Sequence, residues 1–204
     1  MNMDLDFKIV NIVATARFRG TIDIELIKMT PPNGFTLEGF NEKKKLVELS
    51  IKKKIQDDRS LRKRKPTHTP KEKEIRIRVK VFERVINVFG ATSIEEIRDI
   101  VSRILSHAGI DVSTASIKVV NVVVITEIGR KIDIYELSKK LPSQLAPDIF
   151  PGLIARVPNS NNMGNISFLI FSTGKIVILG ASSMEKAIEA FEKIRDKVIE
   201  ATLQ

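Results

Sequence analysis

Few side chains in this sequence are placed to perform catalysis. The two histidines, His68 and His107, each lack a second histidine, a cysteine or an acidic residue at the spacing of a metal site, and the chain has no cysteine. Neither glycine pattern that cradles a nucleotide phosphate occurs. Acidic pairs such as Asp57-Asp58 are typical of solvated surfaces. We therefore expect a protein that is not an enzyme, with no cofactor, no metal and no small-molecule substrate.

Two asparagines are the better candidates for a binding role. Asn11 in KIVNIVAT and Asn121 in KVVNVVVI each take the fourth position of an apolar strand pattern, 110 residues apart. An amide inside such a strand is costly unless it is satisfied, so its recurrence indicates a shared role. Val13 and Val123 follow two residues later and therefore lie on the same strand faces as the asparagines.

These strands belong to a tandem repeat. TIDIELI, which contains Asp23, recurs 110 residues later as KIDIYEL, which contains Asp133, and each aspartate is placed to cap a short helix. The order of strand, short helix, several strands and long helix occurs twice. We expect a first repeat over residues 1–110, a second over residues 111–204, and an α+β fold with its helices on one face of the sheet.

A long amphipathic helix closes each repeat. GATS and GASS precede runs with a period near 3.6, which predict helices at Ile94–Ala108 and Met184–Leu203. Capping-box spacing is met by Thr92 with Glu95 and by Ser182 with Glu185.

The positive charge is concentrated in one segment. The chain carries a net charge of +9, and Lys52–Glu74 contains ten Lys or Arg against four Asp or Glu. This segment lies between predicted strands Leu46–Ile51 and Ile75–Phe82 and contains Pro66 and Pro70, so we expect a basic hairpin loop inserted at about 52–74. Such a charge balance suggests a polyanionic partner.

Two motifs near the C-terminus carry a resemblance to a known family. FPGLIARV begins at Phe150, and LIFSTGKIVILGAS begins at Leu169. In this order and spacing they resemble the C-terminal repeat of the TATA-box-binding protein family, in a divergent, archaeal-type form. The resemblance implies a saddle of two joined repeats: a curved antiparallel sheet whose concave face binds the DNA minor groove and whose helices cover the convex face.

The resemblance also implies roles for individual residues. A phenylalanine pair in each repeat enters the base steps, and the second repeat keeps both as Phe150 and Phe171. In the first repeat Lys44 replaces one phenylalanine, while Phe82 matches the other. Phosphate contacts match Arg156 and Lys175. The complete set of implied DNA contacts is Asn11, Val13, Phe82, Asn121, Val123, Phe150, Arg156, Leu169, Phe171 and Lys175.

The first repeat departs from the family pattern at several of these positions. The counterparts of Arg156 and Lys175 are uncharged, namely Ser50 and about Val85. The family's threonine before Gly-Ala is replaced in both repeats, by Phe89 and Leu179. We therefore expect phenylalanine wedges mainly from the second repeat, with the basic segment offsetting lost phosphate contacts.

The resemblance implies a protein partner and a cellular location as well. Asp148 and Ile149 match the surface that binds transcription factor B, although Ala146 replaces an acid there. Three functions stay open: a transcription factor on A·T-rich DNA, a paralogue that lost TATA recognition and became an interaction module, and a substrate-binding domain of the kind found in some ribonucleases H and DNA glycosylases. Without a membrane span or cysteines, we expect a cytoplasmic protein, nucleoid-associated if archaeal.

Overall fold

The chain forms two compact units. The computed structural model describes residues 5–56, 72–158 and 164–203. The central unit comprises residues 14–118, and the terminal unit comprises residues 1–13 and 119–204. The division into two repeats at residue 110 is a statement about the sequence and stays a prediction.

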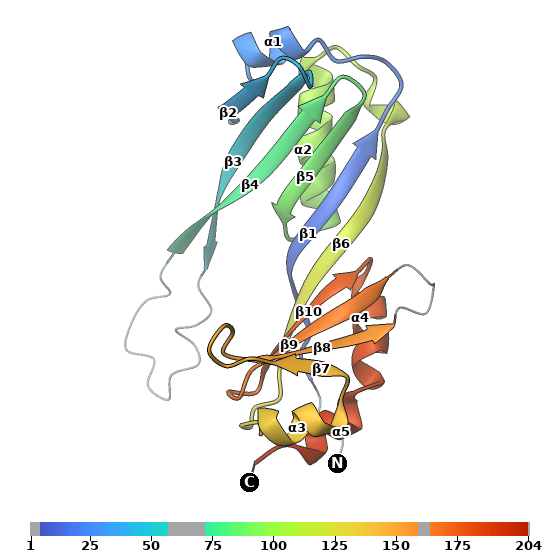
Figure 1. Ribbon diagram of the computed structural model, residues 1–204. Coiled ribbons are helices and arrows are strands. Elements are labelled where there is room, and N and C mark those ends of the chain that lie inside the picture. The colour runs from blue at the N-terminus through green and yellow to red at the C-terminus, as the bar shows by residue number, and fades with distance from the viewer. Residues whose placement is uncertain (1–4, 57–71, 159–163, 204) are drawn as a thin grey trace. The chain divides into compact units, whose positions relative to one another are not determined.

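The strands of the described residues form one sheet, in the order β2-β3-β4-β5-β1-β6-β10-β9-β8-β7 (Figure 1). Neighbouring strands whose register is resolved are antiparallel. The strands are β1 (Lys8–Arg17), β2 (Thr36–Asn41), β3 (Leu46–Gln56), β4 (Glu72–Phe82), β5 (Val85–Ala91), β6 (Ser116–Glu127), β7 (Ser143–Leu145), β8 (Leu153–Pro158), β9 (Asn165–Ile170) and β10 (Lys175–Ala181).

The helices separate groups of these strands. They are α1 (Ile24–Met29), α2 (Ile94–His107), the short 3₁₀ helix η2 (Val112–Thr114), α3 (Ile134–Lys140), α4 (Met184–Glu192) and α5 (Arg195–Glu200). Asp23 and Asp133 cap α1 and α3 as predicted, because each carboxylate accepts from the backbone N–H groups two and three residues later. The caps of α2 and α4 are Ser93 and Ser183, one residue after the predicted capping boxes.

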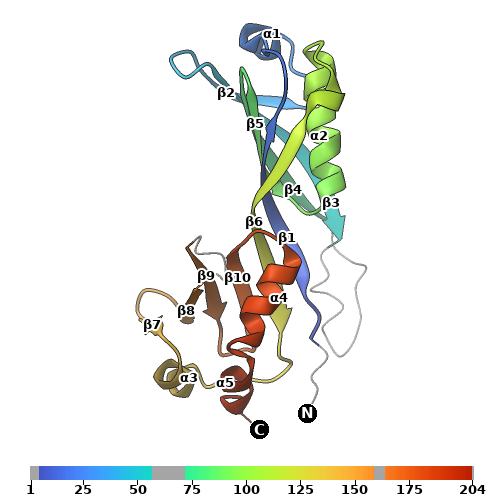
Figure 2. The ribbon, with the colours of Figure 1, turned by 90° about the vertical axis from the view of Figure 1, so that its right-hand side faces the viewer.

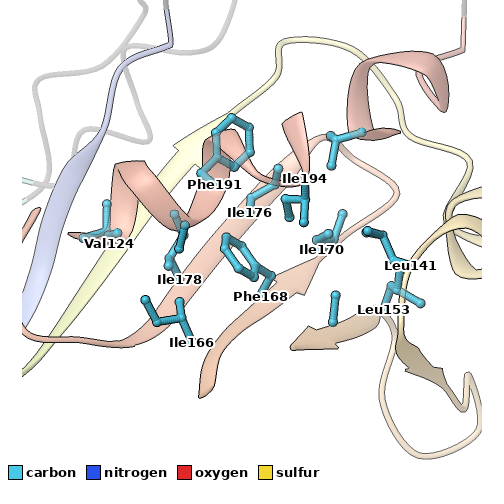
Figure 3. Close-up of a cluster of buried hydrophobic side chains, with 14 of the residues drawn as sticks. Val124, Leu141, Leu153, Ile166, Phe168, Ile170, Ile176, Ile178, Phe191 and Ile194 are labelled. Carbon is cyan, nitrogen blue, oxygen red and sulfur yellow. The ribbon is translucent and has the colours of Figure 1, made fainter. Parts of the chain in front are cut away.

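The core of the terminal unit lies between its strands and α4 (Figure 3). Val122 and Val124 of β6 alternate with half-buried neighbours, so one side of the strand faces this core. Phe168 of β9 and Phe191 of α4 are fully buried within it. The edge-to-face contact of Phe7 with Phe191, 5.5 Å between ring centroids, ties the N-terminal strand to the same core.

The core of the central unit is built in the same way. α2 packs along one side of β3, β4 and β5 (Figure 2). Ile97, Ile100 and Ile104 are buried on one stripe of α2, and Val79 and Val88 are buried directly opposite each other on β4 and β5. With each unit carrying its long helix on one sheet face, the predicted α+β class with an antiparallel sheet is confirmed.

The last predicted helix, Met184–Leu203, is wrong as a single element. α4 ends at Glu192, and the Ile194 N–H donates to the Phe191 carbonyl, three residues back, at 2.9 Å. This tighter turn separates α4 from α5 while Ile194 and Val198 both stay buried in the core. No proline or glycine marks the break, so the sequence carried no signal for it.

The predicted basic loop is also shorter than expected. β3 and β4 pair along their whole length, from Leu46 opposite Phe82 to Gln56 opposite Glu72. Lys52 and Glu74 form a cross-strand ion pair at 3.0 Å, which favours the longer hairpin. Both ends of the 52–74 segment are therefore strand. Its middle, with Pro66 and Pro70, lies outside the described residues.

Candidate nucleic-acid interface

The side of the terminal unit's sheet opposite α4 carries a continuous apolar row. We call this side the terminal open face. The residues of the row stand directly opposite one another on four adjacent strands, and each is half-buried. Apolar side chains that no helix covers are available to a flat apolar partner. The row consists of Ile125 on β6, Val177 on β10, Leu169 on β9 and Ile154 on β8.

Two phenylalanines pack against each other beside this row. Phe150 and Phe171 have ring centroids 5.5 Å apart and planes tilted by 57°, and both are half-buried. They lie outside the core cluster that holds Phe168. Gly152 makes room for them: a β-carbon there would lie 2.8 Å from the Phe150 ring and 3.3 Å from the Phe171 ring. The pair is thus held outside the core at a site built for two rings.

Asn121 is satisfied by the backbone of the neighbouring strand. Its amide oxygen accepts the Gly180 N–H at 2.9 Å. This bond lies at a register shift between Ile178 and Ala181, where Gly180 adopts φ +92° and the regular ladder is interrupted. Because the oxygen is occupied, the amide NH₂ remains as a donor. A donor is the group that can reach the acceptors of an A·T minor groove.

Two cations flank the apolar row. Arg156 on β8 is exposed and stands opposite Ser167, and Lys175 on β10 is exposed and stands opposite Glu127. Their alternation with buried residues on each strand places both on the terminal open face.

The remaining predicted contacts divide between the two units. Asn11 and Val13 belong to the terminal unit, where both are half-buried and flank the buried Ile12. Val123 repeats this pattern on β6, between buried Val122 and Val124. Nine of the ten predicted residues thus lie in the terminal unit. Phe82 is the exception and belongs to the central unit.

Strand register gives Lys44 and Phe82 the central-unit positions that correspond to Phe150 and Phe171. Leu46 stands opposite Phe82 on β3 and β4, at the positions that correspond to Gly152 and Phe171. Leu46 is 6% exposed, so a leucine fills the space that the glycine leaves open in the terminal unit. Lys44 lies in an exposed turn where its N–H donates to the Asn41 side chain at 3.0 Å. The central unit therefore has one phenylalanine at this position and no ring pair.

Sequence reasoning missed a larger difference between the units. The central-unit positions that correspond in register to the apolar row are polar, and they bond to each other. The Thr15 hydroxyl donates to the Asn87 amide oxygen at 2.8 Å, and Lys80 pairs with Glu48 at 3.1 Å. The row in the central unit reads Thr15, Asn87, Lys80 and Glu48.

The predicted partner-binding residues lie in an exposed turn before β8. Ile149 is 88% exposed, and its N–H and that of Phe150 both donate to the Ala146 carbonyl at 2.9 Å. Asp148 is exposed beside it. A groove of about 430 Å³ lies next to this turn and is lined mainly by apolar side chains, among them Ile134, Tyr135, Leu145, Pro147, Phe150 and Leu203.

The histidine that the structure describes has a structural role. His107 ends α2, and its Nε2 lies 2.6 Å from the Thr30 carbonyl oxygen. Across residues 5–56, 72–158 and 164–203, no group of three His, Cys, Asp or Glu side chains could hold a metal ion. His68 lies outside this part of the chain. No helix among the described residues is long and apolar enough to cross a membrane.

Comparison with known proteins agrees with the architecture. The family model described as transcription factor TFIID, or TATA-binding protein, matches residues 116–201. The TATA-box-binding protein of Methanocaldococcus jannaschii is 28% identical over 97% of this chain and 96% of its own length. Its solved structure superposes with a TM-score of 0.69 at 26% identity, covering 96% of this chain and 99% of that one. In sequence and in fold, the chain is similar to the TATA-box-binding protein family.

Other TATA-box-binding proteins match a smaller share of the chain. The Methanococcus aeolicus protein is 32% identical over 56% of this chain and 64% of its own length. The TATA-box-binding protein 2 of Haloferax volcanii is 40% identical over 42% of this chain and 44% of its own length. Because the family is one of transcription factors, the prediction of a protein that is not an enzyme is confirmed.

Proposed function

We propose that this protein is a transcription factor that binds A·T-rich duplex DNA in the minor groove through its terminal open face. The observation that carries the proposal is the apolar row with the Phe150–Phe171 pair beside it, all left uncovered by α4. A flat apolar surface flanked by aromatic rings suits the sugar edges and floor of an opened minor groove. Proteins of this family insert such rings between base steps and kink the duplex.

Polar groups on the same face make the contacts with base edges and phosphates. The free NH₂ of Asn121 donates to base acceptors, and Asn11 takes the same role on β1. Arg156 and Lys175 contact phosphates, which fixes the orientation of the protein without reading sequence. Val13 and Val123 add apolar contact beside the two asparagines.

The bend should come mainly from the terminal unit. Phe150 and Phe171 form a pair there, whereas Lys44 leaves Phe82 alone in the central unit. We expect Phe150→Ala and Phe171→Ala each to remove most of the bend, because a ring that wedges a base step cannot be replaced by a methyl group. The measurement is energy transfer between dyes at the two ends of a short A·T-rich duplex.

Phe82→Ala is the matched control. It removes a half-buried ring of the same size from the central unit and should change the energy transfer less than either terminal-unit variant. A bend that survives Phe150→Ala, or that depends more on Phe82, would contradict the proposal. Gel shifts over a range of salt concentrations give the affinity of each variant on the same duplex.

We also infer that the exposed turn at Asp148 and Ile149 binds a transcription factor B. An isoleucine that is 88% exposed next to an apolar groove is an anchor for a protein partner. Ile149→Ser should weaken a transcription factor B complex on DNA while leaving binding of the naked duplex unchanged. A protein with this function acts on the chromosome, which an archaeal cell holds in its nucleoid.

The alternative is an interaction module that no longer recognises TATA sequences. The polar row of the central unit favours an interaction module, but only for the central unit. Equal affinity for A·T-rich and G·C-rich duplexes, with no loss in Phe150→Ala, would support the alternative over the transcription factor.

A further inference from the structure

The sheet face of the central unit that is turned away from α2 carries an ordered set of charges. We call it the central open face. Arg76, Arg78 and Lys80 alternate on β4 with fully buried Ile77 and Val79, so all three cations lie on this face. They follow one another along a single strand at the two-residue spacing of a β-strand.

The two outer cations are already neutralised. Arg76 pairs with Glu38 at 3.3 Å, and Lys80 pairs with Glu48 at 3.1 Å. The same oxygen of Glu38 also accepts from the buried hydroxyl of Ser50 at 2.5 Å. These pairs are built into the sheet and leave no net charge at either end of the row.

Arg78, between them, has no such partner. It is exposed and makes no ion pair or hydrogen bond with any other residue in the described part of the chain. Its position stands opposite Phe89 on β5, whose ring is half-buried. Around it lies a hollow of about 580 Å³, lined chiefly by Glu38, Glu48, Arg76, Arg78, Lys80 and Phe89.

We propose that the central open face docks an extended acidic protein segment whose carboxylate pairs with Arg78. A guanidinium accepts a carboxylate through two parallel hydrogen bonds, and the Phe89 ring offers an apolar contact for the neighbouring side chain. The flanking ion pairs then restrict the partner to one negative charge at this point, which is the charge complementarity expected of a protein interface.

A nucleic-acid occupant fits this face less well. A phosphate backbone would bring successive negative charges along the strand, against Glu38 and Glu48 on either side of Arg78. The floor of an A·T minor groove presents only acceptors, and a carboxylate has no proton to donate to them. The central open face thus differs in partner from the terminal open face, and its function is independent of the one proposed above.

The test uses the full chain and a blocked, dye-labelled valine-rich peptide that carries a single aspartate, with an asparagine-for-aspartate peptide as the uncharged match. Fluorescence anisotropy should show binding of the aspartate peptide only. Arg78→Gln should weaken that binding at least about tenfold, the scale of a charged hydrogen-bonded pair. Arg98→Gln is the control, because Arg98 is an exposed arginine on α2, which covers the opposite face of the sheet.

Each outcome decides the proposal. Selective loss in Arg78→Gln, with unchanged binding and bending of A·T-rich duplex, supports it and separates it from the DNA function, which depends on Phe150. Failure of the wild-type chain to bind the aspartate peptide, equal binding of both peptides, or equal loss in Arg98→Gln overturns it. Binding of oligothymidylate that is lost in Arg78→Gln, in place of peptide binding, assigns the face to nucleic acid and also overturns it.

Discussion

Asn121 allows the two possible roles of one side chain to be measured separately. In the structure its amide oxygen accepts the Gly180 N–H at 2.9 Å, and its NH₂ group is left to donate outward. Asn121→Ala removes both functions, whereas Asn121→Asp keeps the acceptor and removes the donor. Aspartate has nearly the same size and shape, so the bond to Gly180 survives the second change.

The expected magnitudes differ between the two variants. Losing the Gly180 bond at this partly exposed site should cost Asn121→Ala about 0.5–1.5 kcal/mol in the free energy of unfolding. Asn121→Asp should stay within about 0.5 kcal/mol of the wild type. Both should lose affinity for A·T-rich DNA, by about 1–3 kcal/mol or roughly 5- to 150-fold for the lost base contact, and Asn121→Asp by more because its charge faces the groove.

Urea unfolding gives the stabilities, and gel shifts on one A·T-rich duplex give the affinities. The contribution of Asn121 to DNA binding is refuted if Asn121→Asp binds the duplex as tightly as the wild type. The structural role is refuted if Asn121→Ala is as stable as the wild type. Asn11→Asp tests the donor role alone on β1, where Asn11 is also half-buried but its side chain makes no hydrogen bond to the described residues.

Three further changes test local packing. Gly152→Ala should lower stability by about 1–3 kcal/mol and reduce DNA bending, because its β-carbon would lie 2.8 Å from the Phe150 ring; in Gly39→Ala the nearest atom is 3.9 Å away and thermal melts should show little change. Thr126→Val should raise stability by about 1–2 kcal/mol, since the Thr126 hydroxyl is buried without a partner among the described residues, and an unchanged melt would show that the hydroxyl is satisfied. Ser93→Ala should cost about 1 kcal/mol by removing the cap of α2, and a wild-type urea midpoint would contradict this.

The regular elements were predictable because their signals are local. Asp23 and Asp133 capped the short helices at the expected positions, and the predicted strands Leu46–Ile51 and Ile75–Phe82 lie within β3 and β4. The caps of the long helices were placed one residue early, because GATS offers two adjacent hydroxyl residues and only the backbone decides between them. The break before α5 had no local signal at all, since it depends on burying Ile194 and Val198 together.

The candidate interface was predictable only where motifs are continuous. FPGLI and LIFSTGK led directly to Phe150 and Phe171. The polar row of the central unit was missed because its members come from four strands whose offsets to the other repeat differ. Thr15 lies 110 residues before Ile125, whereas Lys80 lies 89 before Leu169 and Glu48 lies 106 before Ile154. Only the observed register aligns them, so no single shift of the sequence could show that these residues are neighbours.

The division of the chain has a consequence for its biosynthesis. The central unit is one continuous segment, residues 14–118, whereas the terminal unit needs residues 1–13 together with residues 119–204. All residues of the central unit are therefore synthesised before residues 119–204 of the terminal unit, so the central unit can fold first. Phe7, by contrast, can reach Phe191 in its own core only when the chain is nearly finished, so the core behind the face with Phe150 and Phe171 is the last part of the protein to form.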